Sequence, residues 1–131
     1  MITTRDMREW LKTLHTKFNK YYAGKLDTKY EDAVCIYTYK SELGRAMAIG
    51  GEETTKTKHA MFTILVHVNK NYCETEEKAY ALYENIASAR HINVGNYNIN
   101  YIEMLSDKPV DLHTDESGVY ERLIDITVYY N

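Results

Sequence analysis

The segment VYERLIDITVYYN, residues 119–131, constrains the fold most, because its side chains alternate along the chain as in a β-strand. One face carries Tyr120, Ile124, Ile126, Val128 and Tyr130, and the other carries Glu121, Leu123, Asp125, Thr127 and Tyr129. Both faces contain aromatic and aliphatic groups, so the strand is expected inside a sheet. We expect the even-numbered face to pack on helices and the odd-numbered face to meet a neighbouring molecule.

Five further elements are expected from the hydrophobic periodicity. They are helices over residues 4–22 and 73–90, and strands over residues 32–40, 60–69 and 97–105. Thr3 or Thr4 can cap the first helix and Thr75 the second. In the strand over 97–105 the alternation slips, and a bulge near Tyr101 would reconcile its two halves.

This order of elements predicts an α+β fold. Strand pairs joined by loops favour antiparallel hairpins, and helices between such pairs favour a second layer. We expect an antiparallel sheet of about four strands with two helices packed on one face, in the order αββαββ. A single domain over residues 1–131 is the simplest organisation.

The composition excludes several classes of protein. Hydrophobic residues make up 44% of the 131 residues and charged residues 27%, as in ordinary globular domains. A net charge of −3 supplies no general attraction to nucleic acid or to an anionic membrane. No apolar run is long enough for a membrane span, and the start of the chain does not resemble a secretory signal. Thirteen tyrosines against two phenylalanines suit half-buried sheet faces and protein interfaces.

No motif in the sequence indicates catalysis or cofactor binding. Gly51 is followed by Glu52 rather than lysine, so the glycine-rich segment does not match a P-loop. A metal between His67 and Cys73 is disfavoured, and the acidic segment DLHTDE lacks the spacing of a calcium loop. Cys35 and Cys73 are expected to be two buried thiols. We therefore expect no enzyme, no metal and no cofactor; a small ligand-binding α+β domain stays an alternative.

Three stretches carry a family resemblance. They are YAGKLDTKYEDAVCIYTYK, RAMAIGGEETTKTKHAMFTILVHVNKNYCETEEKAYALYENI and PVDLHTDESGVYERLIDITVYYN. The marks within them are the turn at residues 48–51, the strand end at 67–71 with its acidic helix start, and residues 114–120 before a tyrosine-rich strand. The chain resembles small minor capsid proteins of long-tailed phages of Gram-positive bacteria or their prophages, a group similar to the phage tail terminators.

The resemblance implies a structural role in the virion. Tail terminators are α+β proteins that form a ring, typically a hexamer, on the end of the tail tube. The ring halts tube polymerisation and offers a surface to the head connector, while DNA passes through its lumen without sequence-specific binding. The protein would be made in the bacterial host cytoplasm and would reside in the tail or neck of the virion. A head-completion stopper or adaptor between portal and tail is the alternative position.

Two surfaces are expected to make the subunit or tail-tube contacts. A closed ring uses head-to-tail contacts, so each subunit needs two different surfaces. The terminal strand could supply one through Leu123 and Tyr129. The long glycine-rich connection could supply the other, through Arg45, Met47, Ile49, Gly50 and Gly51. The lysines of the segment TTKTKH could touch DNA phosphates, although a solvated hairpin arm is the commoner role.

Overall fold

A computed structural model describes residues 1–39 and 57–131 of the chain. Two helices and seven strands are found there: α1 (Thr4–Leu11), β1 (Lys20–Ala23), β2 (Ala33–Thr38), β3 (Lys58–His67), α2 (Tyr72–Ala87), β4 (Arg90–Val94), β5 (Tyr97–Met104), β6 (Val110–Thr114) and β7 (Tyr120–Tyr130). The strands form one sheet in the order β1-β2-β3-β7-β5-β4, and β6 pairs with β7 outside this path. The β1–β2 pair is parallel and the other pairs are antiparallel.

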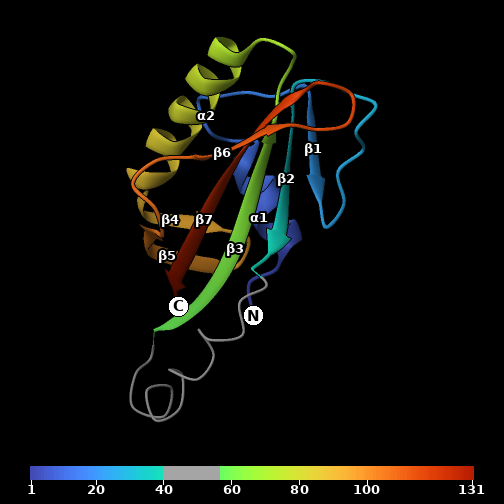
Figure 1. Cartoon of the computed structure of the whole chain (residues 1–131). Coiled ribbons are helices and arrows are strands. Elements are labelled where there is room, and N and C mark those ends of the chain that lie inside the picture. The colour runs from blue at the N-terminus through green and yellow to red at the C-terminus, as the bar shows by residue number, and fades with distance from the viewer. Residues whose placement is uncertain (40–56) are drawn as a thin grey trace.

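The predicted sheet of about four antiparallel strands, with two helices layered on one face, is therefore wrong. The described sheet is mixed, has seven strands and curls around its core (Figure 1). Strand β1 overlaps the last residues of the predicted first helix, β4 lies mostly in residues 91–96, which were expected to be the turn after the second helix, and β6 lies in a segment expected to be a loop. The predictions missed these strands because their partners are distant in sequence or, for β4, because the hairpin was interpreted as a turn.

Helix α1 is shorter than its apolar stripe suggested. Thr3 caps it as expected: its hydroxyl accepts from the Asp6 N–H, while the Asp6 carboxylate accepts from the Thr3 N–H. The helix ends at Leu11, and the Thr13 hydroxyl then donates to the Trp10 carbonyl at 2.6 Å. The residues that follow leave the helix and lead into β1.

Helix α2 begins earlier than expected. Asn71, not Thr75, is its cap, and the Asn71 side chain accepts from the Glu74 N–H at 3.0 Å. Thr75 is buried within the first turns. The periodicity of this segment predicts an apolar stripe of Ala79, Leu82, Tyr83 and Ile86; Ala79, Leu82 and Ile86 are buried as expected, and Tyr83 is partly buried against the core.

Strand β7 is the centre of the sheet. One of its edges pairs with β3 along almost its whole length, and its other edge is shared end to end by β5 and β6. The register with β5 shifts between Ile99 and Tyr101, which confirms the expected bulge. Because β7 has neighbours on both sides, its backbone is paired within the sheet, as expected from its two apolar faces.

The inside of the curl holds the hydrophobic core. Helix α1 lies behind the sheet in Figure 1 and contacts β2, β1 and β4, whereas α2 lies beside β7 and contacts β7, β5 and β3. The even-numbered side chains Ile124, Ile126 and Val128 are completely buried in this core. The expectation that this face packs inward is confirmed.

The two termini meet at the same end of the molecule (Figure 1). The Tyr130 hydroxyl accepts from the Ile2 N–H at 3.2 Å, and the Tyr97 hydroxyl accepts from the Met1 amino group at 2.9 Å. The rings of Tyr97 and Tyr130 pack edge to face, with centroids 5.2 Å apart. These contacts tie the first residues of the chain to the end of β7.

Candidate functional site

The structure describes two of the seven predicted interface residues. Leu123 and Tyr129 lie on the odd-numbered face of β7, and both are partly buried. The other five, Arg45, Met47, Ile49, Gly50 and Gly51, lie outside the described residues. The candidate site is therefore built around the outer face of the sheet.

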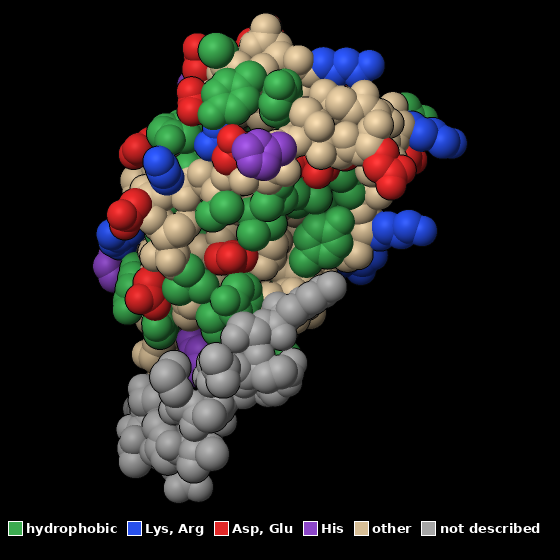
Figure 2. Space-filling model, in the orientation of Figure 1, with side chains coloured by type: hydrophobic (Ala, Val, Ile, Leu, Met, Phe, Trp, Pro, Cys, Tyr) green, Lys and Arg blue, Asp and Glu red, His purple; other side chains and the backbone are tan. Residues whose placement is uncertain are grey.

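Strand register assembles this outer face into cross-strand rows. Leu65 pairs with Leu123, Thr63 pairs with both Tyr37 and Asp125, Thr127 pairs with Met61 and Glu103, and Tyr129 pairs with His59 and Tyr101. Directly paired residues point to the same face of a sheet. We call the following set the tyrosine face: Tyr37, Met61, Leu65, Tyr101, Glu103, Leu123, Asp125 and Tyr129. Figure 2 shows hydrophobic side chains gathered over this side of the sheet, with acidic side chains among them.

A stacked tyrosine pair lies on the tyrosine face. The rings of Tyr101 and Tyr129 lie almost parallel, 4.7 Å apart at their centroids, and Tyr101 is 43% exposed. The Tyr129 hydroxyl donates to Glu103 Oε1 at 3.0 Å. The pKa of Tyr129 is raised to about 12, mainly because the side chain is partly buried and also because its hydroxyl donates to a carboxylate. The pair therefore presents flat, neutral rings beside a negative charge.

The side chains of Asp125 and Tyr37, also on the tyrosine face, have hydrogen-bond partners among neighbouring residues. The Thr63 hydroxyl donates to Asp125 Oδ1 at 2.5 Å, and the Tyr37 hydroxyl accepts from the Leu26 N–H at 3.1 Å. The face carries Glu103 and Asp125 but neither lysine nor arginine, and the ion pairs of the described residues do not include these two carboxylates. A partner for this face would thus be flat or aromatic and would carry positive charge.

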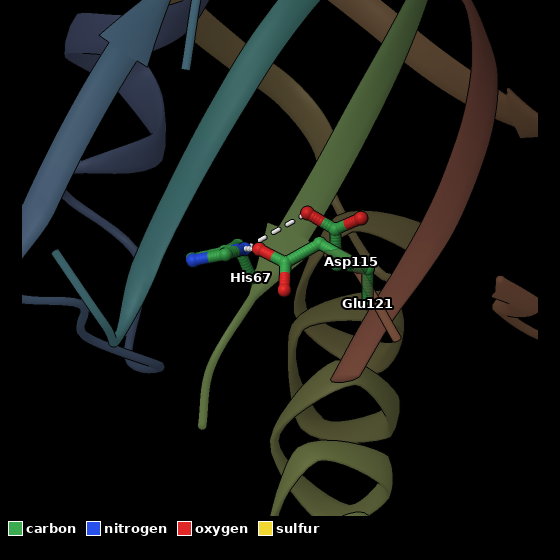
Figure 3. A group of neighbouring side chains, drawn as sticks. All are labelled: His67, Asp115 and Glu121. Atoms are coloured by element: carbon green, nitrogen blue, oxygen red, sulfur yellow. Dashed lines mark hydrogen bonds and ion pairs between the residues drawn. The ribbon is translucent and has the colours of Figure 1, made fainter. Parts of the chain in front are cut away.

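A second cluster lies at the upper end of the same face. His67 at the end of β3 is completely buried, and its Nδ1 lies 2.8 Å from Glu121 Oε2 and 3.8 Å from Asp115 Oδ2 (Figure 3). Glu121 is the cross-strand partner of His67, and Asp115 belongs to the turn between β6 and β7. Asp115 is held in place because its Oδ1 accepts from the N–H groups of Ser117 and Val119.

This cluster fits a hydrogen-bonded clamp better than a metal centre. His67 Nε2 is buried and has no polar partner among the described residues, which favours the tautomer with its hydrogen on Nδ1, donated to Glu121. Metal binding through Nδ1 would leave the hydrogen on Nε2, whereas histidine ligands almost always donate that second N–H to an acceptor. The clamp instead joins the β6–β7 turn to the end of β3.

Cys73 was the neighbour of His67 considered from the sequence, where a metal site was disfavoured. Cys73 is exposed on α2, so the expectation of two buried thiols is wrong for it, and the cluster forms with Asp115 and Glu121 instead. Cys35 is buried, and that burial raises the pKa of its thiol and makes it a poor nucleophile. The direct pairing of His67 with Glu121 depends on the β3–β7 register, which the sequence alone does not show.

An open cleft of about 580 Å³ lies beside the N-terminal end of α2. It is lined by Asn19, Glu31, Asp32, Val68, Asn69, Glu74, Glu77 and Lys78. Lys78, the cation of the cleft, forms an ion pair with Asp32 and lies over the Phe18 ring. The cleft is thus acidic and hydrophilic, and its lining groups do not include an activated nucleophile.

The described residues form a small β-rich domain whose most distinctive surface is an aromatic sheet face suited to protein contact. None of the described helices is long and apolar enough to cross a membrane.

The chain belongs to the family described as bacteriophage tail terminator protein, whose model matches residues 1–131. No curated protein and no solved structure matches the chain in the corresponding searches. The family identifies the chain as a structural component of the virion that takes part in phage assembly and interacts with tail and head components. The resemblance noted from the sequence is therefore confirmed at the level of the family.

Proposed function

We propose that this protein forms a ring on the end of the phage tail tube, ends the polymerisation of that tube and offers the head connector a surface to join. The tail terminator family supports this position in the virion. The mechanism requires surfaces in a fixed geometry, and no bond is made or broken.

The observation that carries this proposal is the tyrosine face. It is a rigid face of a sheet, built from central strands, and its stacked pair Tyr101 and Tyr129 remains accessible. Accessible aromatic groups on a rigid surface are common anchors of protein interfaces. We assign Leu123 and Tyr129 to a contact with a neighbouring subunit or with the tail tube.

A hexameric ring with DNA passing through its lumen completes the proposal. Each subunit carries a formal net charge of −3. A negatively charged channel would retain few phosphate contacts, and each such contact would slow the passage of DNA. The proposal therefore includes no sequence-specific binding of nucleic acid.

Phage particles that lack this protein test the position in the virion. We expect tails of irregular and excessive length in electron micrographs, because nothing ends tube growth. Filled heads that leak DNA, together with tails of normal length, would instead identify a stopper or adaptor between portal and tail.

Purified components test the mechanism directly. Tail-tube protein polymerised with the wild-type chain should give shorter tubes, each with a ring at one end. A Tyr129→Asp variant should lose this effect, whereas Glu84→Lys, an exposed change on α2, should keep it. Tubes of unchanged length with the wild-type chain would refute the proposal.

A further inference from the structure

The sheet places two chemically opposite surfaces at its two ends. Strand β1 forms one end, while β5 and β4 form the other. The two ends lie on opposite sides of the molecule in Figure 1. Head-to-tail contacts in a closed ring join two such different surfaces.

The end with β1 carries a cluster of lysines. Residues 20–30, which hold β1 and the segment after it, contain three lysines and one aspartate; Glu31 and Asp32 follow, and Asp32 is paired with Lys78. We call Lys20, Lys25 and Lys29, on and just after β1, the lysine edge; all three are exposed. Lys25 and Lys29 take part in no ion pair within the described part of the chain. Their charges are therefore available to another molecule.

The end with β5 carries the complementary groups. Glu103 is exposed and has no ion pair among the described residues, and its hydrogen-bond partner is the Tyr129 hydroxyl. The stacked rings of Tyr101 and Tyr129 lie beside it. A carboxylate next to the face of an exposed tyrosine is a favourable site for an ammonium group, because the ion pair and the cation–π attraction add. The same chain already uses a lysine over a tyrosine, with Lys20 Nζ 4.8 Å from the centre of the Tyr30 ring.

We propose that the lysine edge of one copy of this chain docks on the Tyr101–Tyr129–Glu103 patch of the next copy. The occupant is a second copy because one chain carries both charge-complementary surfaces, at opposite ends of one rigid sheet. This inference rests on the proposed function in one respect, since it names the surfaces that would join neighbouring subunits in the ring. Each subunit would use its lysine edge on one side and its aromatic patch on the other.

Charge reversal tests the contact with the purified chain and no tail protein. One variant, Glu103→Lys, changes only the patch, and a second variant, with Lys25→Glu and Lys29→Glu, changes only the lysine edge. Each variant alone should weaken self-association in sedimentation by about tenfold or more, because like charges would then face each other. The wild-type association should also weaken as salt is raised. Lys70→Glu and Glu84→Lys, both exposed and outside the two surfaces, are the matched controls and should associate like the wild type.

Mixing the two variants gives the sharper result. In an alternating assembly, the intact patch of one variant meets the intact lysine edge of the other, and the two reversed surfaces also carry opposite charges. The mixture should therefore associate within about threefold of the wild type, although neither variant does so alone. A mixture that stays dissociated while both variants remain folded by circular dichroism would overturn the inference. If Glu103→Lys fails to fold, Glu103→Gln paired with Lys25→Gln in a double-mutant cycle should show coupling, and additivity would overturn it equally.

Other outcomes separate the contact from the function. A wild-type chain that stays monomeric at every concentration, with or without tail-tube protein, would overturn the contact. A lysine-edge variant that loses affinity for duplex DNA but not for its own copies would assign the lysines to phosphate and also overturn it. If the mixture is restored but phages lacking the protein have tails of normal length, the contact stands and the proposed function fails. If such phages have overlong tails but the mixture of the two variants stays dissociated, the proposed function stands and the contact fails.

Discussion

Two adjacent tyrosines on β7 should differ sharply in their effect on stability. In a Tyr130→Phe variant the ring keeps its edge-to-face contact with Tyr97, and only the hydroxyl is lost. That hydroxyl accepts from the Ile2 N–H at 3.2 Å, and both Tyr130 and Ile2 are buried, with 2% and 3% of their surfaces exposed. A buried N–H without a partner costs about 1–3 kcal/mol, so the free energy of unfolding should fall by about that amount.

The matched change Tyr129→Phe should have little effect on folding. Its hydroxyl donates to Glu103, an exposed side chain to which water can donate instead. Surface substitutions of this kind usually alter the free energy of unfolding by less than about 0.5 kcal/mol. The two variants therefore remove one oxygen each, from neighbouring residues on opposite faces of one strand.

Urea unfolding can measure both variants with the same probe. Trp10 is 7% exposed in the core, so its fluorescence reports the loss of packing on α1. With a denaturant slope of about 1–3 kcal/mol/M, Tyr130→Phe should lower the midpoint by about 1 M, and Tyr129→Phe should leave it nearly unchanged. Equal shifts in the two variants, or a larger one for Tyr129→Phe, would refute the assignment of these residues to opposite faces.

Three further changes test other parts of the structure. Tyr129→Asp should weaken self-association more than folding, because it places a carboxylate beside Glu103 on the tyrosine face; equal losses by sedimentation and urea unfolding would show that this face is internal. Arg122→Met should lower the free energy of unfolding by about 1–3 kcal/mol, since the side chain is 6% exposed, pairs with Glu76 at 3.3 Å and lies over the Tyr72 ring; a neutral result in calorimetry would contradict this. In alkaline titration, Tyr37 and Tyr129 should ionise near pH 12 rather than near the ordinary tyrosine pKa of 10, because their pKa values are raised to about 12, chiefly by burial. Their contribution to stability is complete below pH 10, the ordinary tyrosine pKa, and is lost as pH rises through 12, so a chain whose unfolding free energy is unchanged across that range would contradict the burial of both rings.

Sequence patterns correctly predicted the elements that depend only on residues close together in the chain. The alternation of residues 119–131 placed Ile124 and Ile126 in the core and Tyr129 outside it, and the structure agrees. The buried stripe of α2 was predicted for the same reason, because helical periodicity depends only on near neighbours. These elements required no knowledge of their partners.

The errors arose where a distant partner decides the structure. The 3–4 spacing of apolar residues continues past Leu11 and suggested one long helix, yet Tyr21 and Tyr22 pair with Val34 and Cys35 in β2 instead. Tyrosines favour strands when a neighbouring strand is available. Strand β6 was missed in the same way, because its polar sequence indicates a strand only when β7 lies beside it.

One missed signal in the sequence was local. Val94 pairs directly with Tyr97 across the two residues Gly95 and Asn96, and Gly95 has a φ of 60°. A two-residue loop with glycine at positive φ is a standard hairpin connection, so β4 could have been predicted from these residues. Residues 91–96 were instead interpreted as a turn that ends the preceding helix, so the strand was missed.

The Tyr101–Tyr129–Glu103 patch depends on a β-bulge in β5, which shows in the sequence pattern and in the pairing with β7. Between Ile99, which pairs with Tyr130, and Tyr101, which pairs with Tyr129, β5 has one residue more than β7. If these residues were regularly paired, without the bulge, alternation would place Tyr101 on the same face as Ile99, inside the core. The bulge turns Tyr101 and Glu103 outward while Ile102 stays buried. The irregular alternation of residues 97–105 thus indicates this bulge. The same shift in register keeps Ile99 and Ile102 in the core and brings two tyrosines and a carboxylate together on the outer face.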